Sequence, residues 1–380
     1  MLKKALWRRQ ILALFWIAAA VILGSVAAAA TTSSSADRAI AAATASDPDQ
    51  VLGNATCVRC HAAEQQVWSV TPHARTFDEL HRRPEATQIA KRLGVASIKH
   101  SGRCVACHYT QQRDPHAGQP AGATLTSTVD ALPAVQHAGD QLHAIAGVSC
   151  ESCHGPARQW LEAHHDYGDS ITTRLTESPA HRSQRIARSV ALGMRNPSNV
   201  YLVAQSCYRC HTTGDEELVN IGEHSPGSAD FEFVSWSQGT LLHNFVSSDG
   251  KINQVSSPHR LRYMFVAGVI ADTEASLRAV ATATVKDRYA IAVAKRAARA
   301  GARLKSVADK IADPRLKQAS DLFASLEIKL NHAAELESAA GKLAEIGYQI
   351  AATESEAHEV SLHQQLVALD RFIPDPKVWK

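Results

Sequence analysis

Four copies of one pentapeptide, C-x-x-C-H, constrain this chain of 380 residues more than any other feature. The chain has eight cysteines and 19 histidines, and random placement at that frequency would give on the order of 0.01 copies. The copies use every cysteine, so none remains for a disulfide bond. They are Cys57-Val-Arg-Cys60-His61, Cys104-Val-Ala-Cys107-His108, Cys150-Glu-Ser-Cys153-His154 and Cys207-Tyr-Arg-Cys210-His211.

Each pentapeptide has the spacing that attaches haem c. The two cysteines form thioethers with the porphyrin, and the following histidine ligates the iron. Zinc is the alternative for C-x-x-C pairs, but a zinc site joins two pairs and does not require a histidine after each. A thioredoxin-like redox pair does not occur in fours. The sequence therefore predicts four covalently bound haem c groups, with His61, His108, His154 and His211 as proximal ligands.

The distal ligands decide whether a haem only carries electrons or also binds a substrate. Methionine is scarce and histidine abundant, which favours two histidines on each iron. His73 follows His61 by 12 residues, and a helix of that length extends about 18 Å, too far to return to the same iron. The same reasoning applies to His164, ten residues after His154. Both histidines are therefore predicted to serve a haem other than the preceding one.

Residues 1–30 have the pattern of a secretory signal: a basic start, an apolar run and four alanines at the end. The alternative is an uncleaved membrane anchor, since the stretch without charges is long enough to span a bilayer. Either interpretation predicts a periplasmic protein. A cleaved signal would leave it free of the cytoplasmic membrane, and an uncleaved anchor would attach it there. The formal charge of +3 includes four basic residues of this segment, so the remainder gives no electrostatic signal for nucleic acid.

The rest of the chain divides by composition and predicts a mainly α fold. Residues 31–50 are small and polar, as in a linker. Residues 51–257 hold the four motifs and many glycines and prolines, which predicts one haem-packed domain with short helices and long loops. Aromatic residues make up only 6% of the chain, so the porphyrins are expected to fill part of its core. Residues 258–380 are rich in alanine and predict a helical bundle or hairpin.

The helical region segregates its charges into a basic stretch, 286–310, and an acidic stretch, 321–359. One interpretation is that the two stretches pack antiparallel with complementary faces. The other is that Lys295, Arg299 and Arg303, on one helical stripe, dock an acidic redox partner or anionic lipid. The basic residues are Lys286, Arg288, Lys295, Arg296, Arg299, Arg303, Lys305 and Lys310, and the acidic ones are Asp321, Glu327, Glu335, Glu337, Glu345, Glu354, Glu356 and Glu359.

Residues around the motifs resemble the tetrahaem cytochrome c-554 family of ammonia oxidisers. The resemblance rests on Trp68 and His73 after the first motif, on the short second motif, and on the stretch 147–156 followed by His164. It implies that His73 ligates the third haem and that His164 ligates the first. The segment 231–243 resembles a family helix whose histidine ligates the fourth haem, which makes His243 the candidate there.

The second haem of that family has no distal ligand from the protein. The resemblance therefore implies a five-coordinate iron at His108, where a small molecule could bind. Spare histidines could also cap this iron, and His224, between Gly222 and Pro226, is the best of them. The others near it in the chain are His100, His116, His137 and His143. The long helical C-terminal region departs from the short tail of the family.

Three functions fit these features. The first is electron transfer between a periplasmic or membrane dehydrogenase and another cytochrome or the quinone pool. The second is catalysis at an open haem, with nitric oxide, hydroxylamine or a similar small nitrogen species as substrate. The third is a structural subunit of a larger respiratory complex, docked through the C-terminal helices. The sequence leaves the oligomeric state open.

Overall fold

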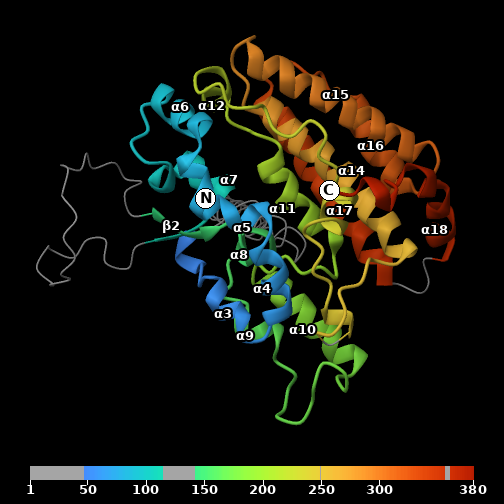
Figure 1. The fold of residues 1–380 in the computed structure, drawn as a ribbon. Coiled ribbons are helices and arrows are strands. Elements are labelled where there is room, and N and C mark those ends of the chain that lie inside the picture. Colours follow the sequence, from blue (N-terminus) through green and yellow to red (C-terminus); the bar gives the residue numbers. More distant parts are fainter. Residues whose placement is uncertain (1–46, 114–141, 249, 356–359) are drawn as a thin grey trace, which may run out of the picture.

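The computed structural model describes residues 47–113, 142–248, 250–355 and 360–380 (Figure 1). The predicted leader, most of the predicted linker, His116 and His137 lie outside the described residues. The described part is mainly α-helical with a single two-stranded sheet, which confirms the predicted fold class. Within these same ranges, no helix combines the length and the apolar character needed to cross a membrane.

Short helices and loops build the region that carries the motifs, as its glycine and proline content predicts. Side-chain caps and prolines start several of them; α5, for example, begins at Pro72, and the Thr71 hydroxyl accepts a hydrogen bond from the amide of Ala74 (3.3 Å). The helices are α3 (Asn54–Val58), α4 (Ala62–Ser69), α5 (Pro72–Glu79), α6 (Pro84–Arg92), α7 (Gly102–His108), α8 (Cys150–His154), α9 (Leu161–His164), α10 (Pro179–Ala191), α11 (Val200–His211), α12 (Glu216–Asn220) and α13 (Phe233–Gln238). Short 3₁₀ turns lie between some of them.

The antiparallel pair β1 (Tyr109–Arg113) and β2 (Leu142–Gly147) joins the second motif to the third. Gly147 is required at the end of β2, because a Cβ atom there would lie 2.3 Å from the carbonyl oxygen of His73. The next amide, of Val148, donates to that same oxygen (3.1 Å). The sheet therefore fixes the backbone at His73 close to the start of the third motif.

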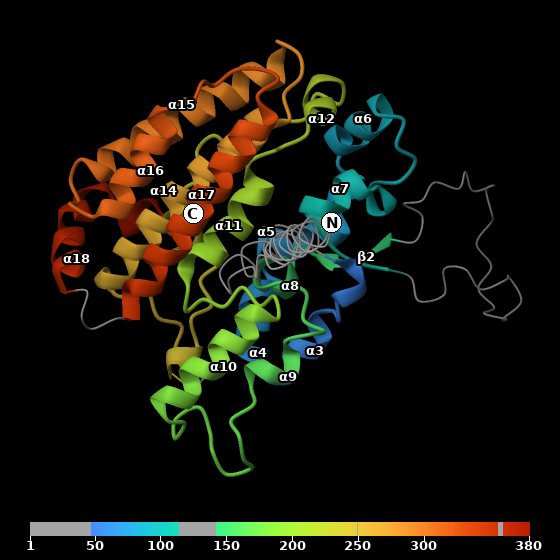
Figure 2. The same ribbon diagram turned by 180° about the vertical axis from the view of Figure 1, so that it is seen from behind.

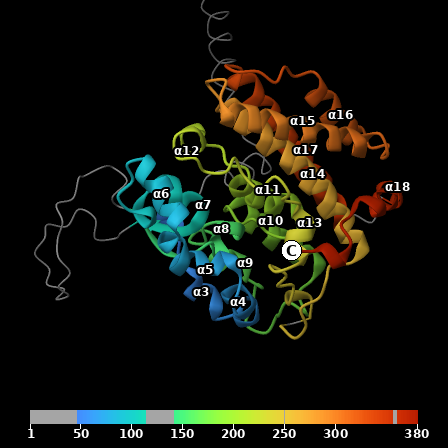
Figure 3. The ribbon, with the colours of Figure 1, turned by 45° about the horizontal axis from the view of Figure 1, so that its top comes forward.

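Five further helices follow and occupy one side of the molecule, with the motif helices on the other (Figures 1 and 3). They are α14 (Pro258–Ala281), α15 (Arg288–Ala308), α16 (Pro314–Ala324), α17 (Ala333–Ala352) and the shorter α18 (Val360–Gln365). Most residues of α14 are buried, because it packs against α15 and α17 and also against α11. The view from behind shows α14, α17 and α11 next to one another, in agreement with their mutual contacts (Figure 2).

The predicted antiparallel pairing of 286–310 with 321–359 is wrong. The basic stretch forms α15, which packs on α14 and α16, whereas most of the acidic stretch forms α17, which packs on α14. Among the described residues, no ion pair joins the two stretches. The apolar α14 decides this arrangement, since it buries its surface on both neighbours at once.

The largest hydrophobic core joins the motif region to the C-terminal helices. It contains Tyr201 and Tyr208 of α11, Phe233 of α13, Ile270 of α14 and Leu343 of α17, all almost fully buried. The composition of the chain changes at Pro258, where α14 begins behind its Ser257 cap, but the packing is continuous across that position. The helix that carries the fourth motif is therefore held by the C-terminal helices.

Candidate functional site

The four motifs lie on or directly after helices, as attachment of two sulfurs to one porphyrin edge requires. Three motifs end α7, α8 and α11, and the first begins in α3 and continues just past it. All eight cysteines are free thiols. One helical turn separates the two cysteines of a motif, so both sulfurs can face the same side.

Each motif histidine faces a second histidine from elsewhere in the chain. The ring centres of His61 and His164 are 6.4 Å apart, and those of His108 and His224 are 6.1 Å apart. In the other two pairs, the ring centres of His154 and His243 are 6.1 Å apart and those of His211 and His73 are 6.2 Å apart. The four separations agree within a few tenths of an ångström although the partners come from different helices and loops.

This spacing fits an iron between the two rings. A metal–imidazole bond is about 2 Å long and the ring centre lies about 1 Å beyond the nitrogen, which puts the ring centres roughly 6 Å apart. In the described part of the chain, no three His, Cys, Asp or Glu side chains gather as they would around a bare metal ion. Two opposed imidazoles alone suit haem, because the porphyrin supplies the other four nitrogens.

Hydrogen bonds at Nδ1 leave Nε2 of several of these rings for a metal. The Nδ1–H groups of His224 and His243 donate to the carbonyl oxygens of Ser225 (2.7 Å) and Leu241 (2.5 Å). His154 donates to Arg195 (3.4 Å), and His164 donates to Leu161. Such bonds orient ligating histidines and fix their tautomer.

Burial keeps three of the motif histidines neutral. It lowers the pKa of His108, of His154 and of His211 to about 4 in each case, with neighbouring positive or titratable groups adding to the effect. A neutral imidazole has a free lone pair, which is the form that binds a metal. The rings are thus prepared for ligation before any cofactor binds.

Each of the four histidines predicted as distal ligands lies opposite a motif histidine, but two of them face another motif than expected. His164 faces His61, the pairing that the resemblance implies, and His224 faces His108, one of the alternatives that the sequence left open. The pairing expected for the other two is wrong: His73 faces the fourth motif instead of the third, and His243 faces the third instead of the fourth. His243 also lies beyond the end of α13, in a loop. Tertiary packing makes this choice, because β2 fixes α5 and the chain after α13 turns back toward α8.

The motifs touch one another in a row. The amide of Gly53, before the first motif, donates to Glu151 of the third (2.7 Å), and the Cys210 thiol of the fourth lies 4.0 Å from the carbonyl oxygen of Ala106 in the second. Between these pairs, the Ser206 hydroxyl of α11 donates to the carbonyl oxygen of Cys153 (2.9 Å). The contacts therefore order the motifs as first, third, fourth and second.

Two buried side chains that the sequence reasoning missed support this row. Glu151, inside the third motif, is 2% exposed and accepts hydrogen bonds from the amides of Gly53 (2.7 Å) and Ala157 (2.7 Å). Arg195 is 1% exposed and donates to the carbonyl oxygen of Ser152 (3.3 Å) and the hydroxyl of Ser206 (3.1 Å). The only signal in the sequence is the acidic residue between two cysteines of one motif.

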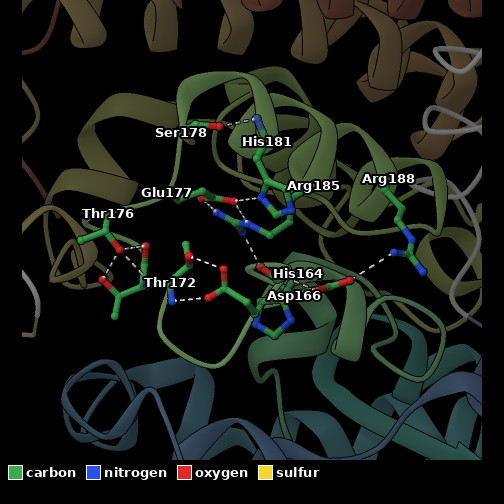
Figure 4. Close-up of polar contacts among 12 residues, drawn as sticks. His164, Asp166, Thr172, Thr176, Glu177, Ser178, His181, Arg185 and Arg188 are labelled. Carbon is green, nitrogen blue, oxygen red and sulfur yellow. Dashed lines mark hydrogen bonds and ion pairs between the residues drawn. The ribbon is translucent and has the colours of Figure 1, made fainter.

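A network of charges surrounds the backbone of His164 (Figure 4). Arg185 donates to the His164 carbonyl oxygen and makes two hydrogen bonds to Glu177, at 2.6 and 2.7 Å. His181 Nδ1 lies 2.6 Å from the same carboxylate. These contacts lower the pKa of Glu177 to about 2, chiefly through the Arg185 guanidinium. The network ties α10 to the end of α9, where His164 lies.

An open groove of about 470 Å³ lies between α15 and the loop that follows His224. Its walls are mostly small apolar residues, with two exposed cations, Lys295 and Arg299, at the α15 side. Neither cation has an ion pair among the described residues. The buried Arg296 forms its floor and donates to the carbonyl oxygens of His211 (3.3 Å) and Ser228 (2.9 Å). The remaining lining residues are Pro226, Gly227, Ala229, Ala292 and Ala298.

Comparison with known proteins points to one family. A family model described as cytochrome c554 and c-prime matches residues 56–155, which include the first three motifs. Cytochrome c-554 of Nitrosomonas europaea is 30% identical over 129 residues, which are 33% of this chain and 47% of the relative. The similarity thus spans about half the length of that relative. No solved structure matches the chain significantly.

Proposed function

We propose that this chain is a periplasmic electron carrier of the cytochrome c554 and c-prime family, whose model matches residues 56–155, and that it holds four haem c groups, each ligated by two histidines. The observation that carries the proposal is the set of four opposed imidazole pairs, one at each motif, with ring centres 6.1–6.4 Å apart. Haem c supplies a one-electron iron couple when bound.

The residues of the chain hold and shield this cofactor. The two cysteines of each motif anchor the porphyrin edge, and the motif histidine is the proximal ligand. His164, His224, His243 and His73 serve as distal ligands at the first, second, third and fourth sites. Glu151 and Arg195 fix the backbones of neighbouring motifs against one another, which keeps adjacent sites at constant separation.

The order of the sites supports transport of electrons through the protein. The contacts of the first motif with the third, the third with the fourth, and the fourth with the second support a row with the first and second sites at its ends. His154 of the third site is partly exposed, as are His61 and His224 at the ends of the row. A row of sites in contact with one another suits a carrier that accepts an electron at one end and releases it at the other.

The alternative, catalysis on nitric oxide, hydroxylamine or a similar species, requires an iron with an open position. His224 opposite His108 argues against it, because this pair has the same spacing as the other three. The second site here thus differs from what the family resemblance implies. We therefore favour the carrier over the enzyme.

Electron paramagnetic resonance of the oxidised full-length protein tests this proposal. The expected spectrum contains low-spin signals only, and the reduced protein does not change its absorption when carbon monoxide or nitric oxide is added. The mass of the protein should exceed that of the polypeptide by four haems. A high-spin signal together with rapid binding of nitric oxide would overturn the carrier in favour of the catalytic alternative.

We further propose that an acidic redox protein docks at the α15 groove. Lys295 and Arg299 are exposed and unpaired among the described residues, and Arg296 beneath them contacts the His211 carbonyl oxygen. Positive charge beside a partly exposed redox site steers a negatively charged partner and brings it close. The apolar walls would exclude water from the contact.

Export to the periplasm is part of the proposal, with residues 1–30 as the leader. The support is their basic start and apolar run, and covalent attachment of haem c after export fits the same compartment. The N-terminal mass of the native protein distinguishes a cleaved leader from a retained anchor. A mature chain that begins near residue 30 would exclude attachment through this segment.

A further inference from the structure

The turn between α14 and α15 contacts the segment that presents His224. Within this turn, Thr284 donates through its amide (3.0 Å) and its hydroxyl (2.6 Å) to the carboxylate of Glu216 at the start of α12. The amide of Val285 donates to the same carboxylate (3.2 Å). At the other end of α12, the side chain of Asn220 accepts from the amide of Tyr289 (2.9 Å). The start of α12 is thus fixed to the turn, and its end is fixed to the first residues of α15. The ribbon shows α12 beside the start of α15 (Figure 1).

Arg288 extends these contacts to the histidine itself. Its Nη2 donates to the carbonyl oxygens of Glu223 (3.3 Å) and His224 (3.0 Å). From the opposite side, Arg92 of α6 forms an ion pair with Glu223 (2.9 Å) and donates to the carbonyl oxygen of Gly222 (3.4 Å). Two arginines from distant parts of the chain therefore hold three consecutive residues, 222–224.

The held backbone is in an unfavourable conformation. Glu223 has φ of 59°, in the left-handed region that side chains other than glycine and asparagine rarely adopt. Such a residue keeps this conformation only when its surroundings enforce it. His73 and His164 lie within helices, whereas His224 lies in a loop, so its position depends on these outside contacts.

We propose that Arg288 and the α14–α15 turn are positioning elements that keep His224 opposite His108 and so close the second haem to external ligands. The inference rests on the proposed function, since it takes this pair as the axial ligands. It assigns the C-terminal helices a role that the motif region cannot fill alone: Arg288 and residues 284–289 all belong to the C-terminal part. Loosening this contact would convert a closed site into an open one.

The test compares five variants of the full-length holoprotein. Arg288→Ala removes the contact, and Arg288→Lys keeps a positively charged donor there. Lys305→Ala is the matched control, because Lys305 is a basic residue of the same helix that pairs with Asp309 and does not line the groove. Because Arg288 is exposed, its truncation leaves the core intact. Glu216→Ala loosens the same turn from the other side, as an independent variant. His224→Ala is the reference for a fully open site.

Two readouts report on the position of His224. The first is the rate at which carbon monoxide binds the reduced protein, which depends on how often His224 leaves. We expect Arg288→Ala to increase this rate about tenfold, as the loss of one charge-assisted hydrogen bond would, and to produce a high-spin signal from one haem. The second is amide hydrogen exchange of residues 216–226, which should become faster in the same variant. Arg288→Lys should show both effects to a smaller degree, and Lys305→Ala should match the unmodified protein.

The outcomes separate this inference from the proposed function. If His224→Ala opens the site but Arg288→Ala and Glu216→Ala change neither readout, the inference is wrong and the axial pair stands. If the unmodified protein already binds carbon monoxide rapidly and His224→Ala has no effect, the axial pair itself is wrong.

Discussion

Arg296 of α15 forms a buried ion pair with Asp272 of α14, with Nη2 and Oδ1 2.9 Å apart. The remaining guanidinium nitrogen, Nη1, donates to the carbonyl oxygens of His211 and Ser228, on either side of the fourth motif's loop. A guanidinium group from the C-terminal helices thus donates a hydrogen bond to the backbone of a motif histidine. The motif region and the helical region are therefore coupled through specific polar contacts as well as through their shared core.

Breaking this pair should be costly. Asp272→Ala would leave Arg296, which is 6% exposed, without its carboxylate, and removing one partner of a buried pair costs about 3–5 kcal/mol. Chemical denaturation of the holoprotein measures the change. The control is Asp309→Ala, which breaks an exposed pair with Lys305 and should cost less than about 1 kcal/mol. Equal effects of the two substitutions would contradict the coupling.

Two glycines of α17 should respond in opposite directions to alanine. A Cβ atom at Gly347 would lie 2.3 Å from the ring of Tyr201 in α11, so Gly347→Ala should destabilise the protein by about 1–3 kcal/mol. At Gly341 nothing lies within 4 Å, and alanine there should stabilise the helix by roughly 0.5–1 kcal/mol. Thermal unfolding distinguishes them. A neutral Gly347→Ala would mean that α17 and α11 do not pack tightly.

The Glu177 network should make stability depend on pH in the acid range. The pKa of Glu177 is lowered from an ordinary 4.5 to about 2, mainly by Arg185, so its charged form stabilises the folded protein above pH 4.5. That contribution is lost as the pH falls from 4.5 toward 2. Glu177→Gln should therefore have a lower melting temperature than the unmodified protein at pH 6, and the gap should narrow toward pH 2.

Glu162→Gln provides the control for that experiment. Glu162 lies on α9, and its side chain is 86% exposed, so its removal should leave the melting temperature unchanged at both pH values. A gap for Glu177→Gln that stays constant from pH 6 to pH 2 would show that the carboxylate does not act through its charge.

Charge reversal at the groove should slow electron transfer with anionic partners. Lys295→Glu combined with Arg299→Glu replaces two exposed cations by anions beside the Arg296 floor. Oxidation by hexacyanoferrate, a small anion, should become about tenfold slower at low ionic strength, and the difference should shrink as salt screens the charges. Hexaammineruthenium, a cation, should show the opposite trend.

The matched control for this surface is Lys317→Glu on α16, an exposed cation paired with Asp321 and remote from the groove lining. It should change neither rate. If Lys317→Glu slows the reaction as much as the groove variant, overall charge rather than a docking surface is responsible.

The paired histidines show what local sequence can and cannot predict. The spacing argument that His73 and His164 leave their own motifs requires only the rise of a helix, and both residues do lie beside other motifs. Which motif each one faces depends on contacts such as the approach of α5 to Gly147. The resemblance alone therefore exchanges the two residues: it pairs His73 with the third motif and His243 with the fourth, whereas the structure has the reverse.

The sequence by itself determined the attachment chemistry. Two cysteines and a histidine within five residues carry it, and their geometry is set inside one helical turn. Only the tertiary structure decided that His224 lies opposite His108. This position depends on the strained backbone at Glu223 and on two arginines from distant segments, Arg92 and Arg288. The physical reason is range: covalent attachment is local along the chain, whereas an axial pair is a contact between segments that only packing and long-range hydrogen bonds bring together.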